Sequence, residues 1–145
     1  MLVNIDSFYN EILKDGSFLK EVTLEEKLIS DIKLESTCIL ITRNYIGSED
    51  GQIGQLLMKS FFYVMSEKET KPSDIILVNR GVFLAAEGSP VLSALHDLDR
   101  SGVSIMCCGT SLNHFKVREE LDLGYVSNMY DILEVLMKAR KVITL

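Results

Sequence analysis

The chain has 145 residues, 47% of them hydrophobic, which is enough apolar material for the core of one compact domain. Its formal net charge of -6 at pH 7 excludes the broad basic surface with which nucleic-acid-binding proteins neutralise phosphates. No apolar run approaches the roughly 18 residues of a membrane span, and the first residues lack a signal-peptide pattern. We therefore expect a cytoplasmic protein with neither nucleic-acid nor membrane partners.

Residues 1–36 are acidic and lysine-bearing, with only short apolar patches, and differ from the remainder of the chain. Ser7 is expected to cap a short amphipathic helix, and Asp15-Gly16-Ser17 to form a turn. We interpret 1–36 as an N-terminal extension and 37–145 as the folded domain.

From Thr37 onward, strand-like apolar runs alternate with segments of helical period. The first strand is expected over 38–42, and a polar loop follows it, Asn44 to Gly51, which contains Gly47. The next segment predicts a helix capped by Asp50. Its buried stripe is expected to comprise the residues at 3, 4 and 7 spacing, Ile53, Leu56, Leu57, Phe61 and Val64, with Phe62 and Tyr63 exposed beside it.

Alternation continues to the end of the chain. Further strands are expected over 75–78, 103–107 and 142–145, with a brief one at Val126. Helices are expected from Ser89-Pro90, with proline at the first helical position, to Gly102, and over 113–121 and 129–137. The fold class is thus α/β, a small, doubly wound, mostly parallel sheet of about five strands with helices on both faces.

In such sheets, ligands bind outside the carboxyl ends of the strands. Three loops are expected to converge at that edge: Asn44 to Gly51, Asn79 to Gly88, and Cys108 to His114. The sharpest chemical candidate among them is Cys108. Cys108 would directly precede a helix capped by Thr110 or Ser111. The unpaired N–H groups and the dipole of that helix would stabilise the thiolate form of its side chain.

A thiolate at that position can attack a sulfane sulfur and hold it as a persulfide, and Gly109 would let the backbone approach the bound atom. The alternative is a buried cysteine that acts as a small hydrophobic residue. Cys107, on the other side of the strand, is assigned to packing.

Other polar residues of these loops are candidates for the pocket. Arg80 and its neighbour Asn79 would lie at the same edge, where Arg80 could hold an anionic sulfur or selenium species, form a structural salt bridge, or be exposed to solvent. His114 could orient or protonate the sulfur ligand, or be a surface residue. The glycine-rich segment from Gly47 to Gly54 precedes a helix but lacks the Lys-Ser/Thr of a phosphate-binding loop, so a nucleotide site is poorly supported.

The third cysteine is Cys38, and an odd count of three in a core-forming chain favours reduced thiols. A disulfide between Cys107 and Cys108 would close a very small, strained ring. Neither a Cys-x-x-Cys pair nor zinc-ligand spacing occurs. We expect no metal and no cofactor.

An ordered series of short motifs carries a family resemblance over residues 37–145. It comprises Ile39-Leu40-Ile41-Thr42, Ile46-Gly47, Gly54-x-Leu56-Leu57-Met58-Lys59-Ser60-Phe61, Val78-Asn79-x-Gly81-Val82, Glu87-Gly88-Ser89, Gly102-Val103-x-Ile105, Cys108-Gly109-Thr110 and Asn128-Met129-Tyr130. This series resembles the DsrE/DsrF-like domain, and most of all the C-terminal domain of YedF-type selenium-metabolism proteins.

The resemblance implies a fold of the DsrE/TusD/YchN kind, assembly into dimers, trimers or hexamers, and a cysteine that receives and relays persulfide sulfur. Carried over to this chain, that cysteine is Cys108, and its protein donor or acceptor would be TusA-like or belong to a selenium pathway. There are two departures. Ser111 stands where YedF-like proteins commonly have a second cysteine, and 1–36 contain no TusA-like Cys-Pro motif.

Two hypotheses follow for the function. The first is a sulfurtransferase-like protein of sulfur or selenium metabolism that carries persulfide on Cys108. The second is a non-catalytic, oligomeric ligand- or partner-binding module with the same fold, which the loss of the second family cysteine favours.

Overall fold

The computed structural model describes residues 24–26, 37–48 and 51–145, and the chain divides into two units, 1–32 and 33–145. Of the first unit, only 24–26 are described, and they are helical. The expected cap at Ser7, the turn at Asp15-Gly16-Ser17 and the cap at Asp50 lie outside the described residues. Everything below concerns the second unit.

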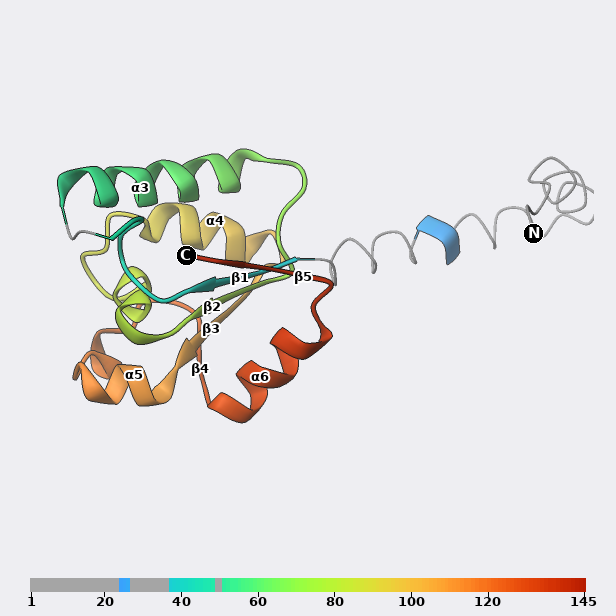
Figure 1. The fold of residues 1–145 in the computed structure, drawn as a ribbon. Coiled ribbons are helices and arrows are strands. Elements are labelled where there is room, and N and C mark those ends of the chain that lie inside the picture. The colour runs from blue at the N-terminus through green and yellow to red at the C-terminus, as the bar shows by residue number, and fades with distance from the viewer. Residues whose placement is uncertain (1–23, 27–36, 49–50) are drawn as a thin grey trace, which may run out of the picture. The chain divides into compact units, whose positions relative to one another are not determined.

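A five-stranded sheet forms the centre of this unit, and all of its neighbouring strands are parallel. The strand order is β4-β3-β2-β1-β5 (Figure 1). The strands are β1 (Thr37–Ile41), β2 (Asp74–Leu77), β3 (Ser104–Cys108), β4 (Tyr125–Ser127) and β5 (Lys141–Thr144). The predicted α/β class, the five strands and the parallel sheet are confirmed.

Helices connect successive strands. They are α3 (Gln52–Glu67), α4 (Leu92–Arg100), α5 (Gly109–His114) and α6 (Met129–Lys138), with the 3₁₀ segments η1 (Asn79–Ala85) and η2 (Arg118–Glu120). The chain steps from β1 to β4 in one direction and then returns through α6 to β5 at the opposite edge. Because parallel crossovers are right-handed, that reversal places α6 on the other face of the sheet. Figure 1 shows α3 and α4 together on one side and α6 on the other.

Strand alternation fills two separate cores. The larger contains Ile39, Ile75, Ile105 and Cys107, which pack with α3 and α4 residues such as Phe62 and Leu95. The smaller lies under α6 and consists of Cys38, Ile76, Met106, Cys108 and Ile132. Adjacent cysteines of β3 therefore belong to opposite faces of the sheet.

The predicted buried stripe of α3 is wrong. The helix buries Gly54, Met58, Phe62 and Met65 instead. The side chains of Ile53, Leu56, Leu57 and Val64 are 45% to 64% exposed, and Phe62, expected to be exposed, is fully buried. Because α3 is apolar on nearly all sides, the spacing of its apolar residues is compatible with two alternative buried faces. Contact with the sheet buries the face that contains the small residue Gly54. Tyr63 is exposed as expected.

Three local predictions also need correction. Pro90 lies in the turn before α4, whose N-cap is Val91, so it is not the first helical residue. The helix expected over 113–121 starts earlier, at Gly109, and a turn separates it from η2. Part of the loop expected from Asn79 to Gly88 is the 3₁₀ segment η1.

Among the described residues, no helix is long and apolar enough to cross a membrane.

Candidate functional site at the carboxyl edge of the sheet

Cys108 is the last residue of β3 and the N-cap of α5. Its side chain is only 3% exposed and packs in the smaller core with Met106 and Ile132. The expected position at the strand-to-helix turn is correct, and Thr110 and Ser111 lie inside α5 rather than capping it. The thiol thus lies at the carboxyl edge of the sheet but beneath its surface.

Cys107 points into the larger core, where it is fully buried. Burial first, and the neighbouring negative charge of an ionised Cys108 second, raise the pKa of the Cys107 thiol to about 12. Cys38 is likewise buried, and burial followed by the carboxylate of Asp74 raises its pKa to about 11. Both thiols therefore stay protonated at neutral pH and serve as packing groups, as predicted for Cys107.

Ser127 is the residue of β4 that pairs with Cys108 in the parallel register. Register partners on neighbouring parallel strands project from the same face, so the hydroxyl of Ser127 and the thiol of Cys108 share the α6 side. Ser127 is 8% exposed, and its Oγ has no hydrogen-bond partner. A buried hydroxyl without a partner is costly and rare, which makes it a donor available to a group held at Cys108.

Gly109 allows the backbone of β4 to lie against the start of α5. A Cβ on Gly109 would come within 3.1 Å of Val126 Cγ1 and 3.2 Å of the Ser127 carbonyl oxygen. The same position is 3.9 Å from Nη1 of Arg118, a guanidinium that also donates a 3.2 Å hydrogen bond to Asn113 Oδ1. Arg118 therefore brings a positive charge next to the residue that follows Cys108.

Ser111 and Asn79 connect two of the three predicted loops. The backbone N–H of Asn79 donates a 2.8 Å hydrogen bond to Ser111 Oγ, across 32 positions of sequence. Asn79 has a left-handed φ of 51°, a conformation that asparagine tolerates better than most residues. The loops after β2 and β3 thus meet, as the sequence predicts.

Arg80 and His114 gather around Phe115 rather than around Cys108. The guanidinium carbon of Arg80 is 5.7 Å from the Phe115 ring centroid and 5.8 Å from that of Phe83. The ring of His114 packs edge-on against Phe115 with 4.9 Å between centroids. These contacts are cation–π and aromatic packing on an exposed surface, and they match the alternative of exposed surface residues for both side chains.

Gly47, in the first loop, adopts a positive φ of 103°, and Arg43 Nη1 donates a 2.7 Å hydrogen bond to its carbonyl oxygen. The loop meets the second loop through Asn44, which lines a pocket of about 120 Å³ with Phe83, Leu84 and Pro90. Gly47 is thus hydrogen-bonded within its own loop, which leads into α3.

Arg118 and Ser127 are the two residues that the sequence alone did not single out. Ser127 immediately precedes Asn128, whose side chain caps α6 by accepting from the Asp131 N–H at 3.0 Å. That capping pattern places Ser127 at the end of a strand, which is the one available sequence signal. No such signal marks Arg118, because it lies at the start of η2 and comes near Gly109 only through the turn that follows α5. In the described part of the chain, no group of three or more His, Cys, Asp or Glu side chains is arranged to hold a metal.

Comparison with known proteins identifies solved structures that share the fold of this chain. No family model and no curated protein matches this sequence. Among solved structures, the ychN protein from E. coli superposes with a TM-score of 0.56 at 13% identity, over 76% of this chain and 99% of that one. A conserved protein of unknown function, BT1422 from Bacteroides thetaiotaomicron, does so with a TM-score of 0.55 at 16% identity, over 79% and 98%.

Such similarity places the chain in a structural class, the small parallel α/β proteins with a YchN-like, DsrE-type fold. It leaves the chemistry of the carboxyl edge to be argued from the residues of this chain.

Proposed function

We propose that this protein is a DsrE/DsrF-like sulfur carrier of sulfur or selenium metabolism, which accepts persulfide sulfur on Cys108 and passes it on. The observation that carries the proposal is the pairing of Cys108 with Ser127 at the carboxyl edge of a DsrE-type sheet, where the serine hydroxyl lacks a partner. Likeness to YedF-type proteins supports a role in selenium handling.

The transfer step conserves atoms and electrons. The Cys108 thiolate attacks the terminal sulfur of a donor persulfide, R–S–SH, and forms a new S–S bond. The donor's own S–S bond breaks, and the donor leaves as a thiolate, R–S⁻. The terminal sulfur stays at the oxidation level of a persulfide, so no other oxidant or reductant takes part.

Neighbouring groups support this step. The hydroxyl of Ser127 can donate to the persulfide, and the charge of Arg118 favours an anionic sulfur near Gly109. Because the pKa of Cys107 is raised to about 12, the adjacent thiol stays protonated and does not compete as a nucleophile.

Partners belong to the same proposal. The sulfur donor or acceptor is a protein, TusA-like or of a selenium pathway, as the resemblance to YedF-type proteins implies. The protein works in the cytoplasm, where thiols stay reduced, as a dimer, trimer or hexamer.

The test is intact-mass analysis after incubation with glutathione persulfide. We expect the wild type to gain the mass of one sulfur atom, Cys107→Ser to gain it as well, and Cys108→Ser to gain none. Equal loading of wild type and Cys108→Ser, or no loading of either, contradicts the proposal.

A second candidate is a binding module without sulfur chemistry. The 3% exposure of Cys108 and its apolar neighbours Ile76 and Ile132 favour it. The two candidates differ in thiol reactivity under native conditions. A carrier shows alkylation of Cys108 ahead of Cys38 and Cys107, whereas a binding module shows three equally slow thiols.

A further inference from the structure

An open groove runs between α3 and the β5 edge of the sheet, remote in the sequence from Cys108. Its volume is about 700 Å³, inside the range of roughly 300–1,000 Å³ that is typical of small-molecule sites. Its walls are mainly apolar and come from α3, β1, β5 and the loop after β1, with Ile39, Ile46, Leu57, Phe61, Val64, Met65 and Ile143 as the hydrophobic members.

The groove follows from the register of the sheet. Thr37 pairs with Lys141 and Ile39 with Ile143, so these four side chains line one face of β1 and β5. Above them lies the side of α3 that the sheet does not use. Leu57 and Val64 are 45% and 50% exposed because the helix packs on the sheet through Met58 and Phe62.

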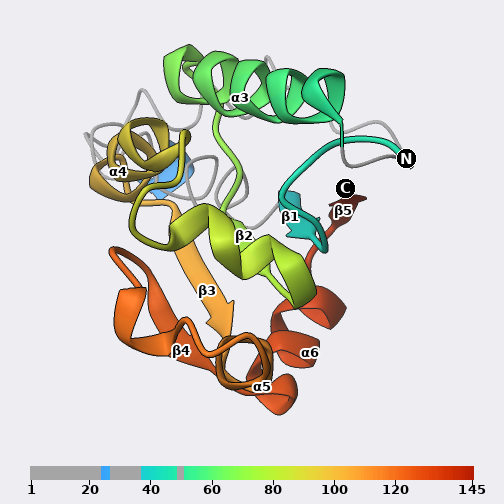
Figure 2. The same cartoon turned by 90° about the vertical axis from the view of Figure 1, so that its left-hand side faces the viewer.

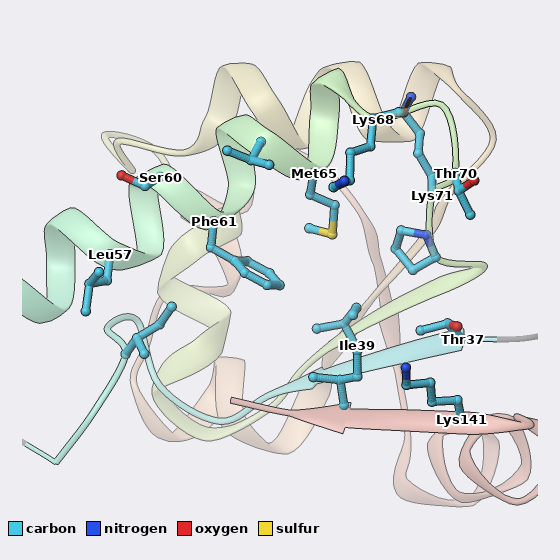
Figure 3. A pocket seen from close by; sticks show the side chains of 14 residues that line it. Thr37, Ile39, Leu57, Ser60, Phe61, Met65, Lys68, Thr70, Lys71 and Lys141 are labelled. Atoms are coloured by element: carbon cyan, nitrogen blue, oxygen red, sulfur yellow. Dashed lines mark hydrogen bonds between the residues drawn. The ribbon is translucent and has the colours of Figure 1, made fainter.

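Positive charge gathers at one end of the groove. Figure 3 shows Lys68, Lys71 and Lys141 near Thr37, at the end opposite Leu57 and Ser60. None of the three lysines takes part in an ion pair among the described residues, although Lys71 Nζ donates a 2.5 Å hydrogen bond to the Lys68 carbonyl oxygen. Among the described residues that line the groove, the charged ones are these three lysines, although Glu67 and Glu69 flank Lys68 in the sequence.

We propose that this groove binds one free medium-chain fatty acid, with the alkyl chain along α3 and the carboxylate among the three lysines. An apolar wall and a cationic end match the two parts of that ligand. From Leu57 to Lys68 the groove follows about 16 Å of helix, long enough for an extended alkyl chain.

A singly charged head group fits this end better than a phosphate does. The carboxyl end of α3 lies here and carries partial negative charge, which disfavours a dianion. The cations are lysines, which act as point charges and lack the bidentate fork that arginine offers a phosphate.

Isothermal titration of the full chain with dodecanoate, below its micelle concentration, tests the proposal. Dodecyltrimethylammonium, which has the same tail and the opposite charge, serves as the ligand control. We expect saturable binding of one dodecanoate per chain and binding of the ammonium that is weaker by roughly tenfold or more.

Variants locate the site. Leu57→Glu, in the groove wall, abolishes binding, whereas Leu56→Glu, on the same helix but outside the groove, leaves it unchanged. The double variant Lys68→Glu/Lys141→Glu weakens dodecanoate binding by roughly tenfold, and Lys59→Glu/Lys116→Glu does not. If circular dichroism shows that Leu57→Glu does not fold, the variants of the exposed lysines still test whether dodecanoate binds in the groove.

Three results would overturn the proposal: no saturable binding, equal affinity for the two amphiphiles, or variants in and out of the groove that behave alike. A fourth such result is that the wild type does not bind dodecanoate and that Leu57→Glu dissociates the oligomer in sedimentation experiments. In that case a second copy of the chain occupies the groove. Sulfur loading of Cys108 is independent of each of these outcomes.

Discussion

The backbone N–H of Asn79 and the side-chain oxygen of Ser111 form a hydrogen bond of 2.8 Å that connects the segment after β2 to α5 (Figure 2). In this protein the hydroxyl holds two loops of the carboxyl edge together. The serine therefore has a structural role, which a thiol would perform less well because sulfur is a weak acceptor.

Ser111→Ala should lower the free energy of unfolding by about 1 kcal/mol, because the bond to Asn79 is lost. Ser111→Cys should fall between alanine and wild type. Urea denaturation followed by circular dichroism measures both changes. Thr110→Ala, an exposed neighbour on the same helix, is the control, and an equal loss in that variant would remove the role assigned to the bond.

Gly81→Ala should be severely destabilising. A Cβ at Gly81 would lie 2.2 Å from the backbone oxygen of Ile41, which cannot move without disturbing the end of β1. We expect a loss of about 3 kcal/mol or more in thermal or urea unfolding. Gly51→Ala, where a Cβ would meet nothing within 4 Å, should lose less than about 1 kcal/mol. Equal losses would show that the close approach of Gly81 to β1 is not a constraint.

Ser127→Ala should leave stability unchanged or raise it by up to about 1 kcal/mol, because it removes a buried hydroxyl without a partner. Ser73→Ala is the matched comparison, since Ser73 Oγ donates a 3.0 Å bond to the Thr37 carbonyl and its loss should cost about 1 kcal/mol. If Ser127 donates to the sulfur carried on Cys108, the alanine variant also loses bound sulfur faster by mass spectrometry. A large loss of stability in Ser127→Ala would mean that its hydroxyl is already engaged.

Stability should fall as the pH rises above about 9. The pKa of Cys107 is raised from 9.0 to about 12 and that of Cys38 to about 11. Between pH 9 and its raised pKa, each of these thiols keeps in the folded protein a proton that it has lost in the unfolded chain. The stabilisation present below pH 9 therefore disappears towards pH 12. Each thiol contributes up to about 1.4 kcal/mol per pH unit.

Urea denaturation at a series of pH values from 8 upward measures this dependence. Lysines and tyrosines titrate in the same range, so the informative quantity is the difference in slope between wild type and Cys107→Ala. The variant should have the shallower decline, whatever its absolute stability. Parallel curves for the two proteins would rule out a raised pKa at Cys107.

The sequence predicts the central strands well, because β1 and β2 contain short apolar runs rich in β-branched residues, which are typical of buried parallel strands. The opposite faces of Cys107 and Cys108 follow from strand alternation, and the structure bears this out. The face of α3 was not predictable in the same way. Its apolar residues form two overlapping stripes, and only contact with the sheet decides that Met58 rather than Leu57 is buried.

The surroundings of Cys108 were less predictable than its position. His114 has the spacing expected of a residue near Ser111, yet it packs on Phe115. Arg118 and Ser127 reach the site through a turn and through strand pairing, neither of which has a local sequence signature. Position along a strand is a local property, whereas the neighbours of a side chain depend on tertiary structure.

The edge strand β4 lies next to Cys108. With 3 residues, it is the shortest strand of the sheet, and β3 is its one neighbouring strand in the described sheet. Tyr125 and Val126 are partly exposed. We expect a strand held this weakly to detach in brief excursions that cost far less than global unfolding, so its amides should exchange with deuterium early. Such fraying would open the side of Cys108 that faces Ser127 while β1, β2 and β3 remain paired, and for a Cys108 that carries sulfur as we propose, its frequency would limit the rate of transfer.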